Sequence, residues 1–196
     1  MKLKTLIIAL SLLTLIIGCR DRVEPEVDDF VEYGWTLYAE RDFRGAHEQF
    51  QEGLAIDSLY IDGYNGSGWC YVEFNEPDSA LAFFREGLIY NNEDSSQVQY
   101  ELLAGFALSY HAIGDFEQAI IQGTKLYNYK PIFEFSHNWQ IDYVDIVIML
   151  AASNYAEGDF AAALTWVQEL DEAFTADITT NEGRAELIKK IELLQN

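Results

Sequence analysis

Basic residues are scarce in this sequence. Its 196 residues include 12 Lys and Arg against 33 Asp and Glu, which gives a formal net charge of -21. A nucleic-acid binder needs a basic face to neutralise phosphates, so this charge balance argues against that class of protein. It also argues against adhesion to anionic lipid by charge alone.

Signatures of catalysis and of metal binding are also missing. The three histidines, His47, His111 and His137, are scattered, and no His or Cys falls at metal-ligand spacing. The sequence has no glycine-rich loop that could cradle a phosphate, no G-x-S-x-G motif and no Asp-x-Asp calcium loop. With 33 carboxylates, close pairs are inevitable and indicate a solvated acidic face. The sequence therefore predicts no enzymatic activity, no cofactor and no metal site.

The longest apolar run stands at the start of the chain. Residues 1–4 carry two lysines, residues 5–17 form a 13-residue apolar run, and Gly18 and Cys19 follow it. The run is shorter than the roughly 20 residues that a membrane-spanning helix needs, and it fits the core of a signal peptide. The ending Ile-Ile-Gly-Cys resembles a bacterial lipobox. The resemblance implies that residues 1–18 are a lipoprotein signal peptide and that Cys19 is acylated. The alternative is an ordinary secretory signal followed by an incidental cysteine.

A lipid on Cys19 would fix the protein to a membrane. Three acyl chains would hold it essentially permanently, since two already suffice for stable anchoring. Lipoproteins of enteric bacteria stay at the inner membrane when Asp directly follows the lipidated cysteine, and here Arg20 stands in that place. By that resemblance we expect the outer membrane, on its periplasmic side. Residues 19–27 are polar and contain Pro25, and they are expected to form the lipidated tether.

Cysteine is too rare for a disulfide framework. Without residues 1–18 the chain has a net charge of -23, and its two cysteines are Cys19 under its lipid and Cys70. A single free thiol cannot form an internal disulfide, so oxidation plays no part in holding the fold. Cys70 lies between Trp69 and Tyr71 without a basic neighbour, which favours a buried core thiol over a reactive one.

The sequence repeats itself at an interval of 34 residues. Shifted by that interval, the Gly-Trp pair at residues 34–35 falls on the pair at residues 68–69, and residues 50–54 fall on residues 84–88. A period of this length indicates a stacked array of helix pairs, because one pair cannot bury its apolar face alone. Two looser copies follow, which share Gly-Asp-Phe and end in Ala: residues 114–119 and 158–163.

This pattern resembles the tetratricopeptide repeat (TPR) over roughly residues 27–175. The TPR pattern places small residues where two helices approach closely and an aromatic residue four positions after the second of them. The resemblance implies an all-α, right-handed solenoid of about four helix hairpins plus a C-terminal capping helix. The small and aromatic residues that match are Gly34, Ala46, Phe50, Gly68, Ala80, Phe84, Ala107, Ala119, Ala151 and Ala163. The expected units are residues 28–60, 61–94, 95–131 and 138–175, followed by the capping helix at residues 180–196.

The later repeats depart from the regular spacing. Five extra residues precede the third unit, and ten more, around residues 131–139, precede the fourth. We therefore expect wider connections or longer first helices there, and a less regular superhelix. Pro77 replaces the aromatic residue of the second unit, and it suits the first turn of a helix.

In TPR proteins the first helix of each hairpin lines a concave groove. Carried onto this chain, the groove positions form a strip of aromatic side chains edged by acids, Asp28 among them. Rigid aromatic side chains inside an acidic rim are suitable anchors for a peptide with apolar and basic residues. The groove has no Lys or Arg clamp of the kind that captures a carboxyl-terminal peptide. The candidate groove residues are Trp35, Tyr38, Asp62, Asn65, Trp69, Val72, Glu101, Leu108, His111, Asp145 and Tyr155.

A structural interpretation of the same residues is equally open. Trp35 and Trp69 could belong to the core and fill the gaps that Gly34 and Gly68 leave. Acids in the first turn of a helix stabilise it whatever the function, because they complement the helix dipole.

Three functions remain open on the sequence. The first is a membrane-anchored adaptor of the bacterial cell envelope that holds a protein or peptide partner in the groove. The second is a structural subunit that packs through its repeat faces against other subunits or copies of itself, and the third is an accessory lipoprotein of nutrient uptake. TPR folds host many roles, so the fold alone selects none of them.

Overall fold

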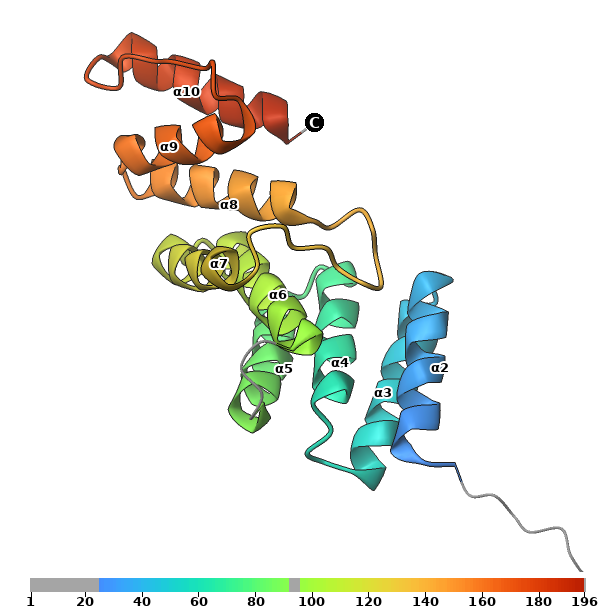
Figure 1. Cartoon of the computed structure of the whole chain (residues 1–196). Helices are drawn as coiled ribbons and strands as arrows, with labels where there is room; N and C mark the ends of the chain where they lie inside the picture. Colours follow the sequence, from blue (N-terminus) through green and yellow to red (C-terminus); the bar gives the residue numbers. More distant parts are fainter. Residues whose placement is uncertain (1–24, 92–95, 196) are drawn as a thin grey trace, which may run out of the picture.

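The protein folds as a stack of helix hairpins. The computed structural model describes residues 25–91 and 96–195, and in that part of the chain it contains nine helices and no strand (Figure 1). The predicted signal peptide, Cys19 and most of the tether lie outside the described residues. The expected all-α, TPR-like solenoid is confirmed. The helices are α2 (Val27–Ala39), α3 (Phe43–Ile56), α4 (Ile61–Glu73), α5 (Pro77–Tyr90), α6 (Gln97–Ile113), α7 (Phe116–Tyr129), α8 (Tyr143–Ala156), α9 (Phe160–Leu170) and α10 (Asn181–Leu194).

The second helix of each hairpin begins at an equivalent repeat position. In three hairpins an Asp carboxylate caps it by accepting a hydrogen bond from a backbone N–H three residues on: Asp42 from Gly45, Asp115 from Gln118 and Asp159 from Ala162. These bonds satisfy N–H groups that have no partner inside the helix. In the remaining hairpin α5 begins at Pro77, as the sequence predicts, because its fixed φ suits the first turn.

One residue in each hairpin turn adopts the left-handed backbone conformation. Gly114 and Gly158 do so at φ values of 80° and 82°, where a residue without Cβ meets no steric penalty. Arg41 and Asn75 occupy the equivalent turns of the first two hairpins at 66° and 58°. All four residues align in the repeat, so the turn geometry is shared even where glycine is not.

Two phenylalanines join the first three hairpins. Phe50 of α3 is fully buried between Gly34 of α2 and Gly66 of α4, and a Cβ on either glycine would collide with its ring. Phe84 of α5 is held in the same way between glycines of α4 and α6. Trp35 and Trp69 do belong to the buried core, as the structural interpretation expected, but the gaps beside Gly34 and Gly68 are filled by these phenylalanines.

The last two hairpin helices and α10 form a separate apolar cluster. Val167 of α9 is buried there against Leu187 and Ile191 of α10. Thr180 caps the start of α10 by accepting a hydrogen bond from the Gly183 N–H at 3.0 Å. The helix α10 thus covers the apolar face that α8 and α9 leave at the end of the stack (Figure 1).

The connection between α7 and α8 is not a simple surface loop. Residues 130–142, called the concave segment below, loop away from α8 toward the ends of α4 and α2 (Figure 1). An isolated antiparallel bridge between Glu134 and Asp142 closes the segment on itself. Phe133 and Phe135 are almost fully buried within the main core. The ten extra residues that the sequence placed in this region therefore fold against the concave side of the first three hairpins.

Within the described part of the chain, no helix is long and apolar enough to cross a membrane.

Candidate partner-binding site on the concave face

The concave segment lies directly on the two tryptophans of the predicted groove. The Phe135 ring stacks on Trp69 with centroids 4.2 Å apart and an interplanar angle of 23°. The His137 imidazole stacks on Trp35 at 3.5 Å and 4°. Trp35 is 7% exposed and Trp69 is 0% exposed. Two rings of the segment thus cover the aromatic strip that the sequence predicted as a partner surface.

Glu101 holds the segment through hydrogen bonds. Its Oε1 accepts bonds from the Ser136 backbone N–H at 3.2 Å, the Ser136 hydroxyl at 2.6 Å and the Gln97 amide at 2.9 Å. Its Oε2 accepts from the Asn65 amide at 2.8 Å and lies 3.9 Å from His137 Nε2. Glu101 is only 1% exposed, and these donors compensate for the water that the buried carboxylate has lost.

Asp62 forms the second carboxylate of this floor, and it is half-buried. It accepts a hydrogen bond from the Trp35 indole N–H at 2.8 Å and another from the Asn65 amide at 3.1 Å. Burial raises the pKa of Asp62, and these two hydrogen bonds oppose the shift. Burial lowers the pKa of His137, and the nearby Asp62 charge opposes that shift. Because its pKa falls below the ordinary histidine value, His137 stacks on Trp35 as a neutral ring near neutral pH.

The structure brings five of the predicted groove residues into one continuous floor. These are Trp35, Asp62, Asn65, Trp69 and Glu101. Tyr38 lies at the edge of the floor, where its ring meets Phe135 edge-on at 6.2 Å and its hydroxyl donates a 3.2 Å hydrogen bond to Glu73. Burial and the Glu73 charge raise the pKa of Tyr38 above its usual range, so the hydroxyl keeps its proton.

Three of the remaining groove residues have structural partners. The His111 Nδ1 lies 2.8 Å from the Ser153 hydroxyl, and burial lowers the pKa of this imidazole. Asp145 caps α8 by accepting a 2.9 Å hydrogen bond from the Asp142 backbone N–H. Tyr155 meets Phe160 edge-on at 5.0 Å. These three side chains do not join the floor.

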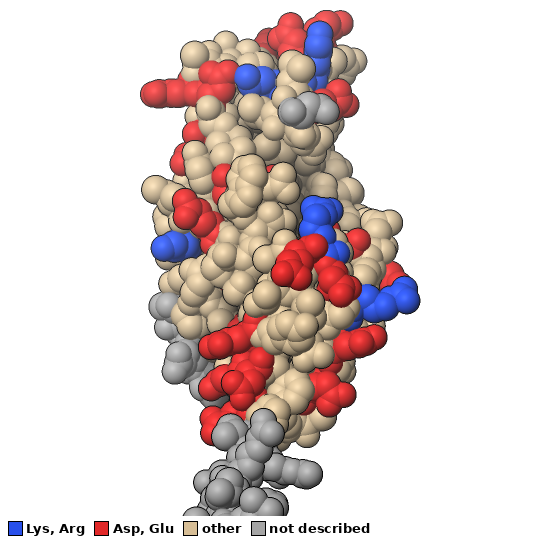
Figure 2. All heavy atoms as spheres, turned by 90° about the vertical axis from the view of Figure 1, so that its right-hand side faces the viewer, with Lys and Arg blue, Asp and Glu red and all other residues tan. Residues whose placement is uncertain are grey.

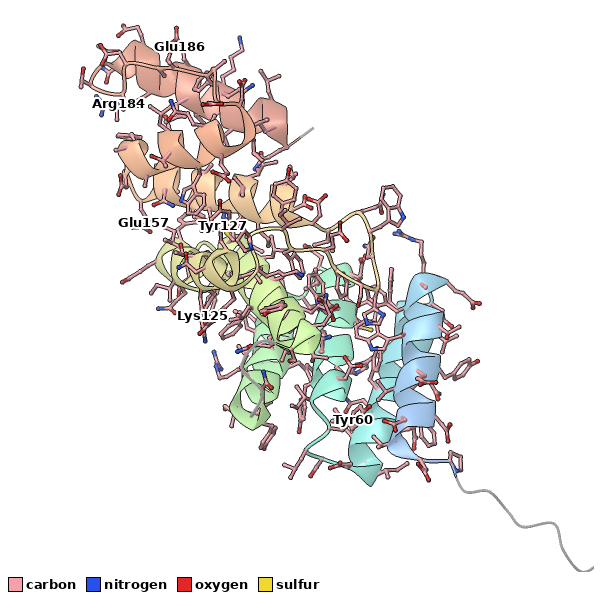
Figure 3. All side chains as sticks on the ribbon, viewed as in Figure 1. Tyr60, Lys125, Tyr127, Glu157, Arg184 and Glu186 are labelled. Carbon is pink, nitrogen blue, oxygen red and sulfur yellow. The ribbon has the colours of Figure 1, made fainter. Side chains whose placement is uncertain are left out.

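Val72 and Leu108 lie apart from the floor and line a smaller hollow of about 130 Å³. Asp28, one of the acids predicted at the groove edge, accepts a hydrogen bond from the Tyr60 hydroxyl. Tyr60 lies at the far end of the stack, where the described chain begins (Figure 3). That acid therefore ties α2 to the turn before α4.

The concave segment is the part of the site that sequence reasoning missed. Phe135, Ser136 and His137 touch the floor, and none of them belongs to a repeat position. A signal was present, because aromatic side chains recur at every second residue over residues 133–139 within the ten-residue insertion. Its length predicted a wide connection, but nothing local indicated where the connection would lie.

Trp139 stands on the outer side of the concave segment, between two hollows. Its side chain is 85% exposed. One hollow, of about 490 Å³, includes Lys130 and Ile132, and the other, of about 240 Å³, includes Arg41. The side of the molecule seen in Figure 2 carries acids crowded toward its lower, N-terminal half, with few Lys and Arg side chains.

The described residues offer little for metal or thiol chemistry. They contain no group of three or more His, Cys, Asp or Glu side chains arranged to hold a metal ion. Burial raises the pKa of the Cys70 thiol to about 12, so the thiol stays protonated and unreactive near neutral pH. The expectation of a core thiol at Cys70 is confirmed.

Solved structures with a similar fold are TPR proteins. The chain resembles YrrB, described as a TPR protein with an unusual peptide-binding site, with a TM-score of 0.66 and 15% identity over 87% of each chain. It resembles MamA with a TM-score of 0.59 and 15% identity, over 85% of this chain and 75% of MamA. It resembles PilW, described as a widely conserved type IV pilus biogenesis factor, with a TM-score of 0.59 and 16% identity, over 83% of this chain and 67% of PilW.

These identities are low enough that the similarities show the fold alone. No family model matches the sequence, and no curated protein matches it. The fold is that of a TPR-type solenoid, a class whose solved members include proteins described by their peptide binding.

Proposed function

We propose that the protein is a non-enzymatic interaction scaffold of the bacterial cell envelope, anchored through a lipid on Cys19. The lipobox-like ending of the apolar run supports the anchor, and Arg20 supports the outer membrane, periplasmic side, as its place. The array would then rise from the bilayer on the tether of residues 19–27. Its strongly acidic surface is repelled by anionic headgroups, so the lipid, and not the folded domain, makes the membrane contact.

One observation carries the assignment of a protein partner. The concave face already holds a non-helical peptide segment, its own residues 133–137, by ring stacking on two tryptophans and hydrogen bonds to a buried carboxylate. A surface built in this way can hold a partner segment of similar chemistry. The candidate groove residues Val72 and Leu108, which line a separate hollow, remain open to such a partner.

The exposure of Trp139 favours a second candidate. A tryptophan that stays outside the core, on a segment whose neighbours are buried, has the properties of an interface anchor. In this alternative the floor stays closed, and the partner packs on the outer side of the concave segment, as expected for a structural subunit.

Cross-linking from single positions tests where a partner binds. A photoreactive phenylalanine analogue replaces Leu108, Trp139 or Ile121, the last being an exposed position of α7 chosen as the control. After illumination of cells and purification of the lipidated chain, we expect adducts with one envelope protein from Leu108 and Trp139, and none from Ile121.

The pattern of adducts separates the alternatives. Adducts from Trp139 alone would favour the second candidate. Adducts from Ile121 alone, or from no position, would contradict a partner on the concave face.

The anchor has its own test. We expect Cys19→Ala to move the protein from the membrane fraction to the soluble fraction, because the variant has no thiol to acylate. Cys70→Ala is the matched control, and it should stay with the membrane because its thiol is part of the core. Membrane association of Cys19→Ala equal to that of the native chain would mean that the cysteine is incidental.

A further inference from the structure

The first two repeats share a tryptophan but not its hydrogen bond. The Trp35 indole N–H donates to Asp62, the acid near the start of the next repeat, at 2.8 Å. The equivalent pair one repeat later is Trp69 with Glu101. Trp35 precedes its acid by 27 residues and Trp69 precedes its acid by 32, and the difference is the five-residue insertion before the third unit.

That second pair is not formed. The Trp69 Nε1 atom is fully buried and has no hydrogen-bond partner among the described residues. Glu101 is instead occupied by Ser136, Gln97 and Asn65. The concave segment thus occupies Glu101, the counterpart of the Asp62 that accepts from the tryptophan of the first repeat. A buried donor without a partner is unfavourable, so the covered floor carries a built-in penalty.

We propose that residues 133–137 are an internal competitor for the concave site, which a partner segment of the same chemistry displaces. This inference rests on the proposed function. The displacing segment would place an aromatic ring on Trp69, hydrogen-bond donors on Glu101, and a flat or cationic side chain on Trp35. The two carboxylates of the floor, the buried Glu101 and the half-buried Asp62, favour a cation at the last position over His137.

The segment is built to leave the floor as one unit. The Glu134–Asp142 bridge and the hydrogen bond from the Phe135 N–H to the Ile141 carbonyl, at 3.0 Å, lie within it and can survive its movement. The helices α7 and α8, which it connects, pack directly on one another. The concave segment can therefore leave the floor while α7 and α8 stay packed on one another.

The energetic balance keeps the floor covered until a ligand arrives. Opening the floor would expose the buried Phe135 ring and break both hydrogen bonds from Ser136 to Glu101, and these losses together outweigh the one hydrogen bond that Trp69 could then form. An incoming segment with its own aromatic ring restores the lost burial. The apparent affinity of the native chain is then the intrinsic affinity reduced by the small fraction of molecules whose floor is open.

A synthetic peptide provides the test. The probe is a fluorescent peptide with blocked ends that copies residues 130–142, added to the full-length chain in detergent. We expect Phe135→Ala to bind it at least about tenfold more tightly than the native chain, because the variant weakens the hold of the internal segment and leaves the floor intact. A second probe carries alanine at the position that copies Phe135. It should bind to the Phe135→Ala protein at least about tenfold more weakly than the unaltered probe does.

Leu187→Ala is the matched control, since it also removes a buried apolar side chain but lies in α10, away from the floor. Equal affinities of the native chain, Phe135→Ala and Leu187→Ala would overturn the proposal. So would dimers of Phe135→Ala in place of peptide binding, because they would assign the floor to a second copy of the chain.

A measurement on the native chain needs no variant. The Ser136 amide is protected from hydrogen exchange by its bond to Glu101. Saturating unlabelled probe should accelerate exchange at this amide, and unchanged protection would overturn the proposal. If Leu108 forms cross-links but Ser136 stays protected, the displacement of residues 133–137 is contradicted and the scaffold function is not. If no position forms cross-links, the proposed scaffold function itself is contradicted.

Discussion

Phe84→Ala is expected to lower the free energy of unfolding by about 3–5 kcal/mol, the range for a buried phenylalanine truncated in a core. The ring has no exposed surface, and it meets Trp69 edge-on at 5.7 Å. It also fills the space above Gly68 and Gly105, which belong to two different helices. Its removal would leave a cavity where α4, α5 and α6 meet, and glycines cannot extend to fill it.

Denaturant unfolding followed by circular dichroism measures this loss. Phe83→Ala is the matched control, because the neighbouring ring is only half-buried and stacks on Tyr71 at the surface of the hairpin. We expect the control to lose clearly less stability. A loss below about 1 kcal/mol for Phe84→Ala would mean that the hairpins hold together without this ring.

Glu101→Ala is expected to lower the free energy of unfolding by about 3 kcal/mol and to release the concave segment. The change removes the acceptor for donors of three residues, the Ser136 side chain and backbone, the Gln97 amide and the buried Asn65 amide. Hydrogen bonds to charged groups contribute about 1.5–3 kcal/mol each, and Asn65 keeps its second bond, to Asp62.

Two readouts and two controls define this experiment. Unfolding by denaturant gives the stability, and hydrogen exchange at the Ser136 amide reports release of the segment. Glu101→Gln retains one acceptor oxygen and should lose less than Glu101→Ala. Glu117→Ala removes an exposed acid and should change stability by less than about 0.5 kcal/mol. A loss in Glu101→Ala no larger than in Glu117→Ala would contradict the role given to this carboxylate.

The prediction of the array succeeded because TPR rules are local. The spacing of Gly34 and Phe50 is set by how closely two helices in one hairpin approach. The Asp that caps three of the four second helices depends only on its immediate neighbours, since an N-cap satisfies the first turn of its own helix. A sequence pattern indicates such interactions directly, because the residues involved lie close together in the sequence.

The prediction of the site was incomplete because the site joins distant parts of the chain. The aromatic strip and its acids could be identified from repeat positions, and Trp35, Trp69, Asp62 and Glu101 do share one floor. Nothing in the repeat indicated that Phe135 and His137 would cover it. The stacking of His137 on Trp35 joins residues about one hundred positions apart, and no local propensity encodes such a contact.

The sequence alone determined the helical array and the order of its repeats, because both depend on contacts within a repeat or between adjacent repeats. It also determined the acidic character of the chain and the lipobox-like ending of its first apolar run, which are properties of composition and local order. Only the tertiary structure decided that the floor would be covered by the chain itself. The physical reason is that an irregular segment takes its shape from the surface it meets, and here that surface consists of two tryptophan rings and a carboxylate that accepts its hydrogen bonds.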